Sequence, residues 1–209
     1  TIYNGCGLRA TIVWYRKIRP YTPLTMKVKG NGQAKILSSD ELQALFSHGF
    51  ISPRDKALFA ICLFSGCRIS EALSLEKSDL FPNLIIFRKC NTKGRLKTRE
   101  IHINPVLRGF LDDYPLSPKS IYVFPGSQCW HPLHRCTADK ILKAACKRVG
   151  IQGASTHSFR RTALTMMHNA GIPLRHIQEI SGHNDLASLQ RYLEVTGEQK
   201  EKAVSVIGW

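Results

Sequence analysis

Apolar residues recur at helical spacing from about residue 39 onward, and candidate capping residues stand at the ends of each run. The stretch SSDELQALFSHG carries one apolar stripe made of Leu42, Leu45 and Phe46. We predict Ser39 as its N-cap and Gly49 as the residue just after its end. This pattern favours a short amphipathic helix that buries one face.

Three further stretches between residues 52 and 150 have helical patterns. In SPRDKALFAICLFSG, Ser52 is the predicted cap, Pro53 takes the first helical position, and Gly66 ends the helix. CRISEALSLEKSDL predicts a short helix directly after that glycine. TADKILKAACKRVG predicts another, with Thr137 and Gly150 as its ends.

A strand pattern interrupts these helices near residue 90. NLIIFRKC and REIHI flank the polar turn NTKGRLKT, and their alternating apolar positions are Ile85, Phe87, Ile101 and Ile103. The later stretch 156–194 predicts three short helices separated by NAGIP and SGHND. We therefore expect a mixed α/β chain that is predominantly helical and contains one small antiparallel sheet.

Residues 1–34 differ from the rest. ATIVWYRKI could form a strand, and the Pro-, Gly- and Lys-rich RPYTPLTMKVKGNGQ resembles a basic arm or linker. We expect residues 35–209 to form the main domain. The whole chain has 30 Lys and Arg against 15 Asp and Glu, a formal charge of +15, which favours a polyanionic partner. Because no apolar run reaches the roughly 18 residues of a membrane span, nucleic acid is the preferred partner.

The seven cysteines are an odd number, are scattered, and include no CxxC pair. This usage favours reduced, intracellular thiols and a cytoplasmic location. CWHPLHRC gathers four residues of zinc-ligand type, Cys129, His131, His134 and Cys136. Their spacing does not match the usual zinc patterns, so a metal site here is a minor alternative.

Five short motifs follow one another along the chain. They place Arg68 in GCRISEALSL, Lys93 in NTKGR, His157 and Arg160 in HSFRRT, His183 in SGHND, and Tyr192 in LQRYLE. Each motif alone is weak, because an H-x-x-R spacing is common by chance. Together, in this order, they resemble the catalytic domain of the tyrosine recombinase (phage integrase) family over roughly residues 35–209.

The chemistry of these residue types agrees with that resemblance. Two guanidinium groups, Arg68 and Arg160, suit the negative charge that develops on the oxygens of a phosphodiester under attack. A tyrosine is only about one part in a thousand ionised at pH 7, so Tyr192 as nucleophile needs a base, and His157 is the candidate. Lys93 would protonate the departing 5′ oxygen, and His183 would donate a hydrogen bond to the phosphate. No metal or other cofactor is required.

The resemblance implies a 3′-phosphotyrosine intermediate, religation without ATP, and four protomers assembled on paired DNA sites. It also implies that the segment after the nucleophile, LEVTGEQKEKAVSVIGW, contacts a neighbouring protomer. The residues suited to that contact are Val204, Val206, Ile207 and Trp209.

Other basic residues near these motifs are candidates for DNA contact. They are Lys89, Arg95, Lys97 and Arg161. Lys97 is also the reserve candidate for the general acid, and Arg161 could instead be structural. We interpret Glu71 as a partner that orients groups around Arg68.

Two readings compete with a recombinase. A type IB topoisomerase-like or hairpin-forming enzyme would share the chemistry, and a DNA-binding protein without activity would share the fold. The second would be expected to lack a nucleophile or an arginine, and none is missing here. Many family members also carry an N-terminal core-binding domain of roughly a hundred residues, and only about 34 precede the predicted domain. We therefore expect either a catalytic-domain fragment or a short member with a brief arm.

Overall fold

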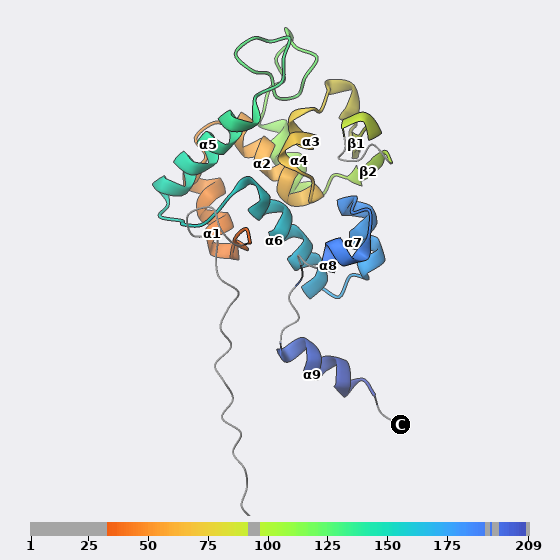
Figure 1. Ribbon diagram of the computed structural model, residues 1–209. Coiled ribbons are helices and arrows are strands. Elements are labelled where there is room, and N and C mark those ends of the chain that lie inside the picture. Colours follow the sequence, from red (N-terminus) through yellow and green to blue (C-terminus); the bar gives the residue numbers. More distant parts are fainter. Residues whose placement is uncertain (1–32, 92–96, 191–192, 194–196, 208–209) are drawn as a thin grey trace, which may run out of the picture.

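The computed structural model describes residues 33–91, 97–190, 193 and 197–207. Figure 1 shows a predominantly helical molecule with one small sheet at its edge. The helices are α1 Ser39–Ala44, α2 Pro53–Ser65, α3 Ile69–Leu73, α4 Pro105–Asp112, α5 Arg135–Arg148, α6 Thr156–Asn169, α7 Leu174–Ser181, α8 Leu186–Gln190 and α9 Gly197–Ser205. A π-helical turn, Leu45–Gly49, extends α1, and two short 3₁₀ turns cover Lys77–Asp79 and Lys89–Asn91. The predicted fold class is confirmed.

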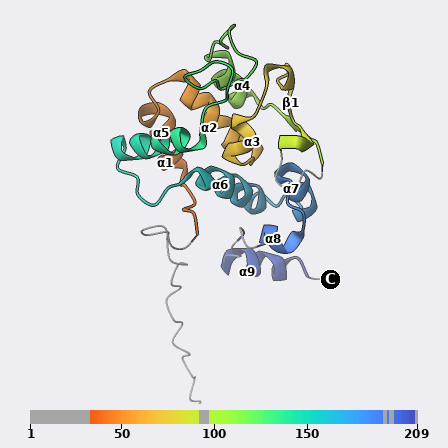
Figure 2. The ribbon, with the colours of Figure 1, turned by 45° about the horizontal axis from the view of Figure 1, so that its top comes forward.

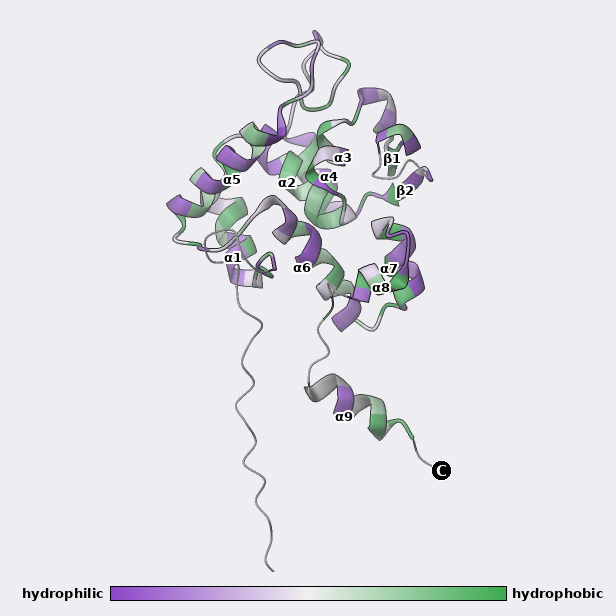
Figure 3. Cartoon of the chain, viewed as in Figure 1, coloured by the Kyte–Doolittle hydropathy of each residue, from purple (hydrophilic) through white to green (hydrophobic). Residues whose placement is uncertain are grey.

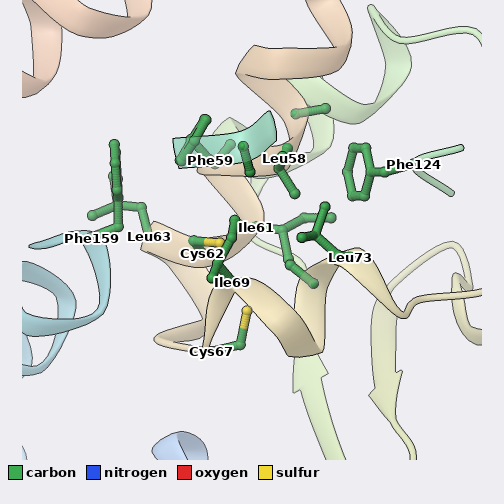
Figure 4. Packing of buried hydrophobic residues seen from close by; sticks show 14 of the residues in the cluster. Leu58, Phe59, Ile61, Cys62, Leu63, Cys67, Ile69, Leu73, Phe124 and Phe159 are labelled. Atoms are coloured by element: carbon green, nitrogen blue, oxygen red, sulfur yellow. The ribbon is translucent and has the colours of Figure 1, made fainter. Parts of the chain in front are cut away.

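Helix α2 is the centre of the core. Its apolar residues are buried almost all round, and Figure 3 shows it hydrophobic along its length, whereas α5 and α6 alternate. It packs against α4 on one side and α6 on another. Phe59 of α2 stacks on Phe50 at 4.7 Å between ring centroids and lies 5.0 Å from Phe159 of α6 (Figure 4). An aromatic contact therefore fixes α6, which carries the predicted site residues His157, Arg160 and Arg161, to the core.

The sheet is a two-stranded antiparallel hairpin. β1 (Leu84–Phe87) pairs with β2 (Arg99–His102), with Ile85 opposite Ile101 and Phe87 opposite Arg99. The two predicted strands are confirmed in position, and Ile85, Phe87 and Ile101 are buried as predicted. Ile103 follows β2 and is only partly buried, and residues 92–96 of the predicted turn lie outside the described residues. The inward position opposite Phe87 holds an arginine, however, and its contacts link the sheet to the site described below.

Two predicted N-caps were wrong. Ser38 caps α1, not Ser39, because a capping box with Glu41 forms only from Ser38. His134 caps α5, not Thr137, since its Nδ1 accepts from the backbone N–H of Cys136 at 3.3 Å. The caps at Ser52 and Gly66 are confirmed, with Gly66 at a left-handed φ of 59°.

Gly49 is not the residue just after the end of the helix, as we predicted, because it is the last residue of the π-helical turn that continues α1. It is buried in the π-helical turn, and a Cβ there would lie 3.3 Å from the backbone oxygen of Ala145. The glycine therefore allows α5 to approach this turn closely.

The C-terminal third follows the predicted breaks. α6, α7 and α8 are separated where NAGIP and SGHND fall, and Figure 2 shows α7 and α8 gathered near one end of α6. A second small core of Leu164, Ile177 and Leu189 joins them. α4 and α9 are further helices that the sequence patterns did not single out. Within the described part of the chain, no helix is long and apolar enough to cross a membrane.

Candidate active site

Arg160 lies at the meeting point of three helices and is 1% exposed. It stands on α6, and its Nη1 donates to the carbonyl oxygens of Gly66, at 2.6 Å, and Ser181, at 2.8 Å. These carbonyls end α2 and α7, where helix backbones leave acceptors without partners. Nη1 thus binds both helix ends. A phosphate would have to bind Arg160 through the other guanidinium nitrogens.

His183 lies against the same guanidinium. Nη2 of Arg160 is 3.1 Å from Nε2 and 3.3 Å from Nδ1 of the imidazole. Because the two ring nitrogens flank a single carbon, an atom at these two distances lies over the face of the ring. The Ser181 hydroxyl lies 2.7 Å from Nδ1. The same hydroxyl also lies 3.3 Å from the carbonyl oxygen of Gln178, so its single proton serves one of these two acceptors. When the hydroxyl donates to Nδ1, the closer of the two, a neutral His183 carries its proton on Nε2 and can donate from there.

The surroundings of His183 favour the neutral imidazole. Burial first, and then the positive charges of Arg160 and Arg68, lower its pKa from 6.5 to about 3. The nearby carboxylate of Asp185 opposes this shift. At neutral pH the ring is therefore an uncharged hydrogen-bonding group rather than a cation.

Arg68 is the N-cap residue of α3 and is held by Glu71 one turn later. Its Nη1 donates to Oε1 of Glu71 at 2.9 Å, and its backbone N–H donates to Oε2 at 3.0 Å. The carboxylate is 1% exposed and also accepts from Nη2 of Arg99 at 2.7 Å. Burial alone would raise the pKa of Glu71, but the charge of Arg99 and the bonds from Arg68 outweigh burial and lower it. The Arg68 side chain is 23% exposed, so it remains accessible from solvent.

The remaining predicted residues in the described part differ in setting. His157 is exposed on the first turn of α6, three residues before Arg160 and so on the same helix face. Lys89 is exposed in the 3₁₀ turn after β1. Lys97 is exposed and forms an ion pair with Glu179 of α7 at 2.7 Å. Arg161 is buried, and its Nη1 donates to the carbonyl of Ala34 at 2.6 Å.

Three predicted residues, Lys93, Arg95 and Tyr192, lie outside the described residues. Their neighbours are described. Asn91 ends the 3₁₀ turn before Lys93, and its side-chain amide donates to the carbonyl of Ser74, just after α3. Leu193 packs against the small core of α6, α7 and α8. Asn91, two residues before Lys93, is thus attached next to α3, where Arg68 lies. Leu193, directly after Tyr192, is attached to the core that includes α6, where Arg160 lies.

One of the four zinc-type residues of CWHPLHRC has a structural role, since His134 caps α5. Within the residues that the structure describes, no group of three or more His, Cys, Asp or Glu side chains is placed to hold a metal ion.

Sequence reasoning missed two residues that contact the site, Arg99 and Ser181. Ser181 orients the His183 ring, as described above. A signal for Arg99 was present, because it occupies an inward position of a strand whose other inward residue is apolar. An arginine at a buried strand position requires a buried partner.

The chain is similar in sequence to known integrases and recombinases. The sequence model of the phage integrase family matches residues 35–199. A putative integrase/recombinase, y4qK, of Sinorhizobium fredii is 32% identical over 165 residues, which cover 77% of this chain and 52% of the relative. Tyrosine recombinase XerD of Rickettsia bellii is 26% identical over 211 residues, covering 91% and 69%.

Solved structures share the fold. The XerA recombinase has a TM-score of 0.71 at 22% identity, covering 90% of this chain and 65% of that one. The catalytic domain of the bacteriophage HP1 integrase has a TM-score of 0.62 at 22% identity, covering 83% of this chain and 95% of that domain. The chain spans between about half and two thirds of the length of most of the curated relatives that it matches.

We predict that His183 stays neutral until far below pH 6. Its folded pKa of about 3 lies below the unfolded value near 6.5, so the unfolded chain takes up the proton first. The stability that neutral His183 contributes is present above about pH 6.5 and is lost as the pH falls toward 3, by at most about 1.4 kcal/mol per pH unit. Ring ¹⁵N NMR measures the pKa, and urea unfolding against pH measures the loss.

The control is His183→Gln, whose stability should fall less steeply than that of the wild type between pH 6 and pH 4. A His183 ring that titrates near 6.5, or two variants with equal slopes, would contradict this account of the site.

Proposed function

Because the chain belongs to the phage integrase family, we propose that it is a site-specific DNA recombinase. In this proposal it cleaves and rejoins DNA strands through a 3′-phosphotyrosine intermediate, and Tyr192 is the nucleophile. The solved relatives include the XerH recombinase bound to its difH substrate and the Tn1549 integrase in complex with DNA. This substrate implies a location beside the nucleoid in the cytoplasm.

One observation carries the proposal. Arg68 lies 92 positions before Arg160 and 115 positions before His183. The three share one cluster in which burial, and then the two arginines, lower the pKa of the histidine. Two cations that a fold brings together against like-charge repulsion suit an anionic ligand, and a phosphodiester is such a ligand. A topoisomerase-like enzyme or an inactive DNA-binding protein remains an alternative that no observation favours.

The proposed reaction is a reversible exchange of one phosphoester for another. The Tyr192 oxygen attacks phosphorus while His157 takes the phenol proton, and the bond to the 5′ oxygen breaks as Lys93 supplies a proton to that oxygen. Arg68 and the Nη2 side of Arg160 stabilise the charge on the non-bridging oxygens. The phosphotyrosine ester retains the bond energy, so a 5′ hydroxyl reverses the step without ATP.

We assign the general acid to Lys93 rather than Lys97. The ammonium of Lys97 is paired with Glu179, whose pKa is lowered by the hydrogen bond and charge of that lysine. Lys89 and Arg95 belong to the same turn region and are proposed DNA contacts. For Arg161, its bond to the carbonyl of Ala34 supports the structural role.

The domain boundary is proposed at residue 35. The backbone N–H of Leu37 donates to Thr162 of α6 at 2.9 Å, and Arg161 holds residue 34. The folded domain thus begins where this segment is fastened to α6. Residues 1–34 would act as a basic arm that adds phosphate contacts, so DNA binding should weaken as salt rises.

We predict a covalent protein–DNA adduct that requires Tyr192. The protein and its Tyr192→Phe variant would be incubated with a nicked-duplex library without added metal. A nick lets the cleaved fragment diffuse away, which prevents religation. A denaturing gel should show an adduct for the wild type and none for the variant.

Binding to the same library serves as the control, since Tyr192→Phe should keep its affinity. An adduct of equal yield in both proteins would exclude Tyr192 as the nucleophile. If the wild type binds but forms no adduct, the assay is repeated with an upstream domain from a relative fused to residue 1. A second blank result would favour a DNA-binding role.

We also propose assembly into a tetramer on paired sites, in which α9 of one protomer contacts its neighbour. Val204, Val206 and Ile207 expose 67%, 77% and 78% of their surface, and α9 stands off from the other helices in Figure 1. An apolar groove of about 570 Å³ lies between α1, α4 and α6. Val106 and Met166 on its rim expose 57% and 53%. The groove and the end of α9 are complementary apolar surfaces within one chain.

Charged substitutions on either surface should give the same defect. We predict that Ile207→Asp and Met166→Asp each reduce assembly on DNA to single protomers, because each buries a carboxylate at the contact. Ile121→Asp, at a residue 61% exposed elsewhere, is the matched control and should assemble normally. Sedimentation velocity with a duplex measures this. Assembly unaffected by Met166→Asp would exclude the groove as the acceptor.

A further inference from the structure

We propose that Arg99 is a positioning residue of the candidate active site. Through Glu71 it fixes the direction of Arg68, and through the end of α7 it fixes the segment that carries His183. The role assigned to Arg99 rests on the proposed function, since it concerns how the same phosphate site is built.

Arg99 is unusually placed for a charged residue. It begins β2, faces inward opposite Phe87, and is 7% exposed. Its guanidinium carbon lies 5.2 Å from the centroid of the Phe87 ring. The Phe87 ring and the strand pairing restrict the Arg99 side chain. Its two terminal nitrogens, Nη1 and Nη2, are therefore held in place toward their partners.

One end of the guanidinium contacts Glu71. Nη2 of Arg99 donates to Oε2 at 2.7 Å, while Nη1 of Arg68 donates to Oε1 at 2.9 Å. A carboxylate that is 1% exposed needs compensation for its lost hydration. Oε2 also accepts from the backbone N–H of Arg68 at 3.0 Å, so Arg99 adds a charged donor to an oxygen that the helix start already holds. The charge-assisted bond from Arg99 fixes Oε2 more firmly, and Oε1 then sets the direction of the Arg68 side chain.

The other end contacts α7. Nη1 of Arg99 donates to the carbonyl oxygen of Ile180 at 2.6 Å, next to the Ser181 carbonyl that Arg160 holds. Gly182 then turns the chain with a left-handed φ of 66°, and a Cβ there would lie 2.7 Å from Nε of Arg99. The turn before His183 is therefore packed directly on this arginine.

Arg99 thus spans the two halves of the phosphate site. α3 carries Arg68, and the segment after α7 carries His183. In the sequence, β2 also comes six residues after Lys93. A single rigid guanidinium joins all three elements, and a lysine could not make both bonds at these angles.

The test uses ¹⁵N-labelled full chain and inorganic phosphate as the probe. The variants are Arg99→Met, which keeps an unbranched side chain but removes the guanidinium group, and Arg99→Lys, which keeps the positive charge. Arg88→Met is the matched control, because Arg88 belongs to the same hairpin, directly after β1, and pairs with carboxylates outside the site, those of Glu76 and Asp79. The side-chain N–H signals of Arg68 and Arg160 report the site directly.

We expect Arg99→Met to move the Arg68 signal before phosphate is added, and to weaken phosphate binding at Arg68 and Arg160 about tenfold, as for one lost charge-assisted hydrogen bond. Arg99→Lys should give a smaller change in the same direction, and Arg88→Met should match the wild type. An unmoved Arg68 signal in Arg99→Met, or an equal change in Arg88→Met, would overturn the proposal.

If Arg99→Met does not fold, Arg99→Lys decides, and an Arg68 signal identical to the wild type would overturn the role. Neither readout involves strand cleavage. If the wild type formed no Tyr192 adduct but the NMR and phosphate results were as expected, the recombinase proposal would be refuted and the positioning role of Arg99 would be retained.

Discussion

The buried carboxylate of Glu71 is the constraint on which the site depends. A carboxylate that is 1% exposed is stable only when its charge is compensated and its oxygens accept hydrogen bonds. Arg68 and Arg99 provide both, from α3 and from β2. The same contacts that satisfy the buried charge bring a helix start, a strand and the end of α7 together. The bonds that compensate the buried charge of Glu71 are therefore the same bonds that set the geometry of the site.

Arg160 performs the corresponding task on the helical side. α2 and α7 both end at carbonyls that need donors, and one guanidinium nitrogen serves both. Phe159, one residue earlier, faces the aromatic core around Phe59. Successive residues of α6 thus anchor the helix in the core and fasten two helix ends. Burial first, and then the positive charges of Arg160 and Arg68, lower the pKa of His183 and keep its ring neutral.

Much of this arrangement could be predicted from the sequence, because local signals determine it. Helical spacing, capping residues and strand alternation located most of the elements, and the order of five short motifs indicated the family. The errors have physical reasons. Ser38 and Ser39 are both good caps, and only the reach of Glu41 selects the first. The role of Arg99 depends on contacts with residues 28 and 81 positions away, which no local pattern records.

The most direct test of the central claim is a structure of the Tyr192→Phe variant bound to uncleaved DNA. The account predicts one backbone phosphate with its non-bridging oxygens facing Arg68, the Nη2 side of Arg160 and Nε2 of His183, and with Glu71 still joined to Arg99. A bound duplex whose phosphates all avoid this cluster would contradict the claim that the buried ion pairs exist to hold a phosphodiester.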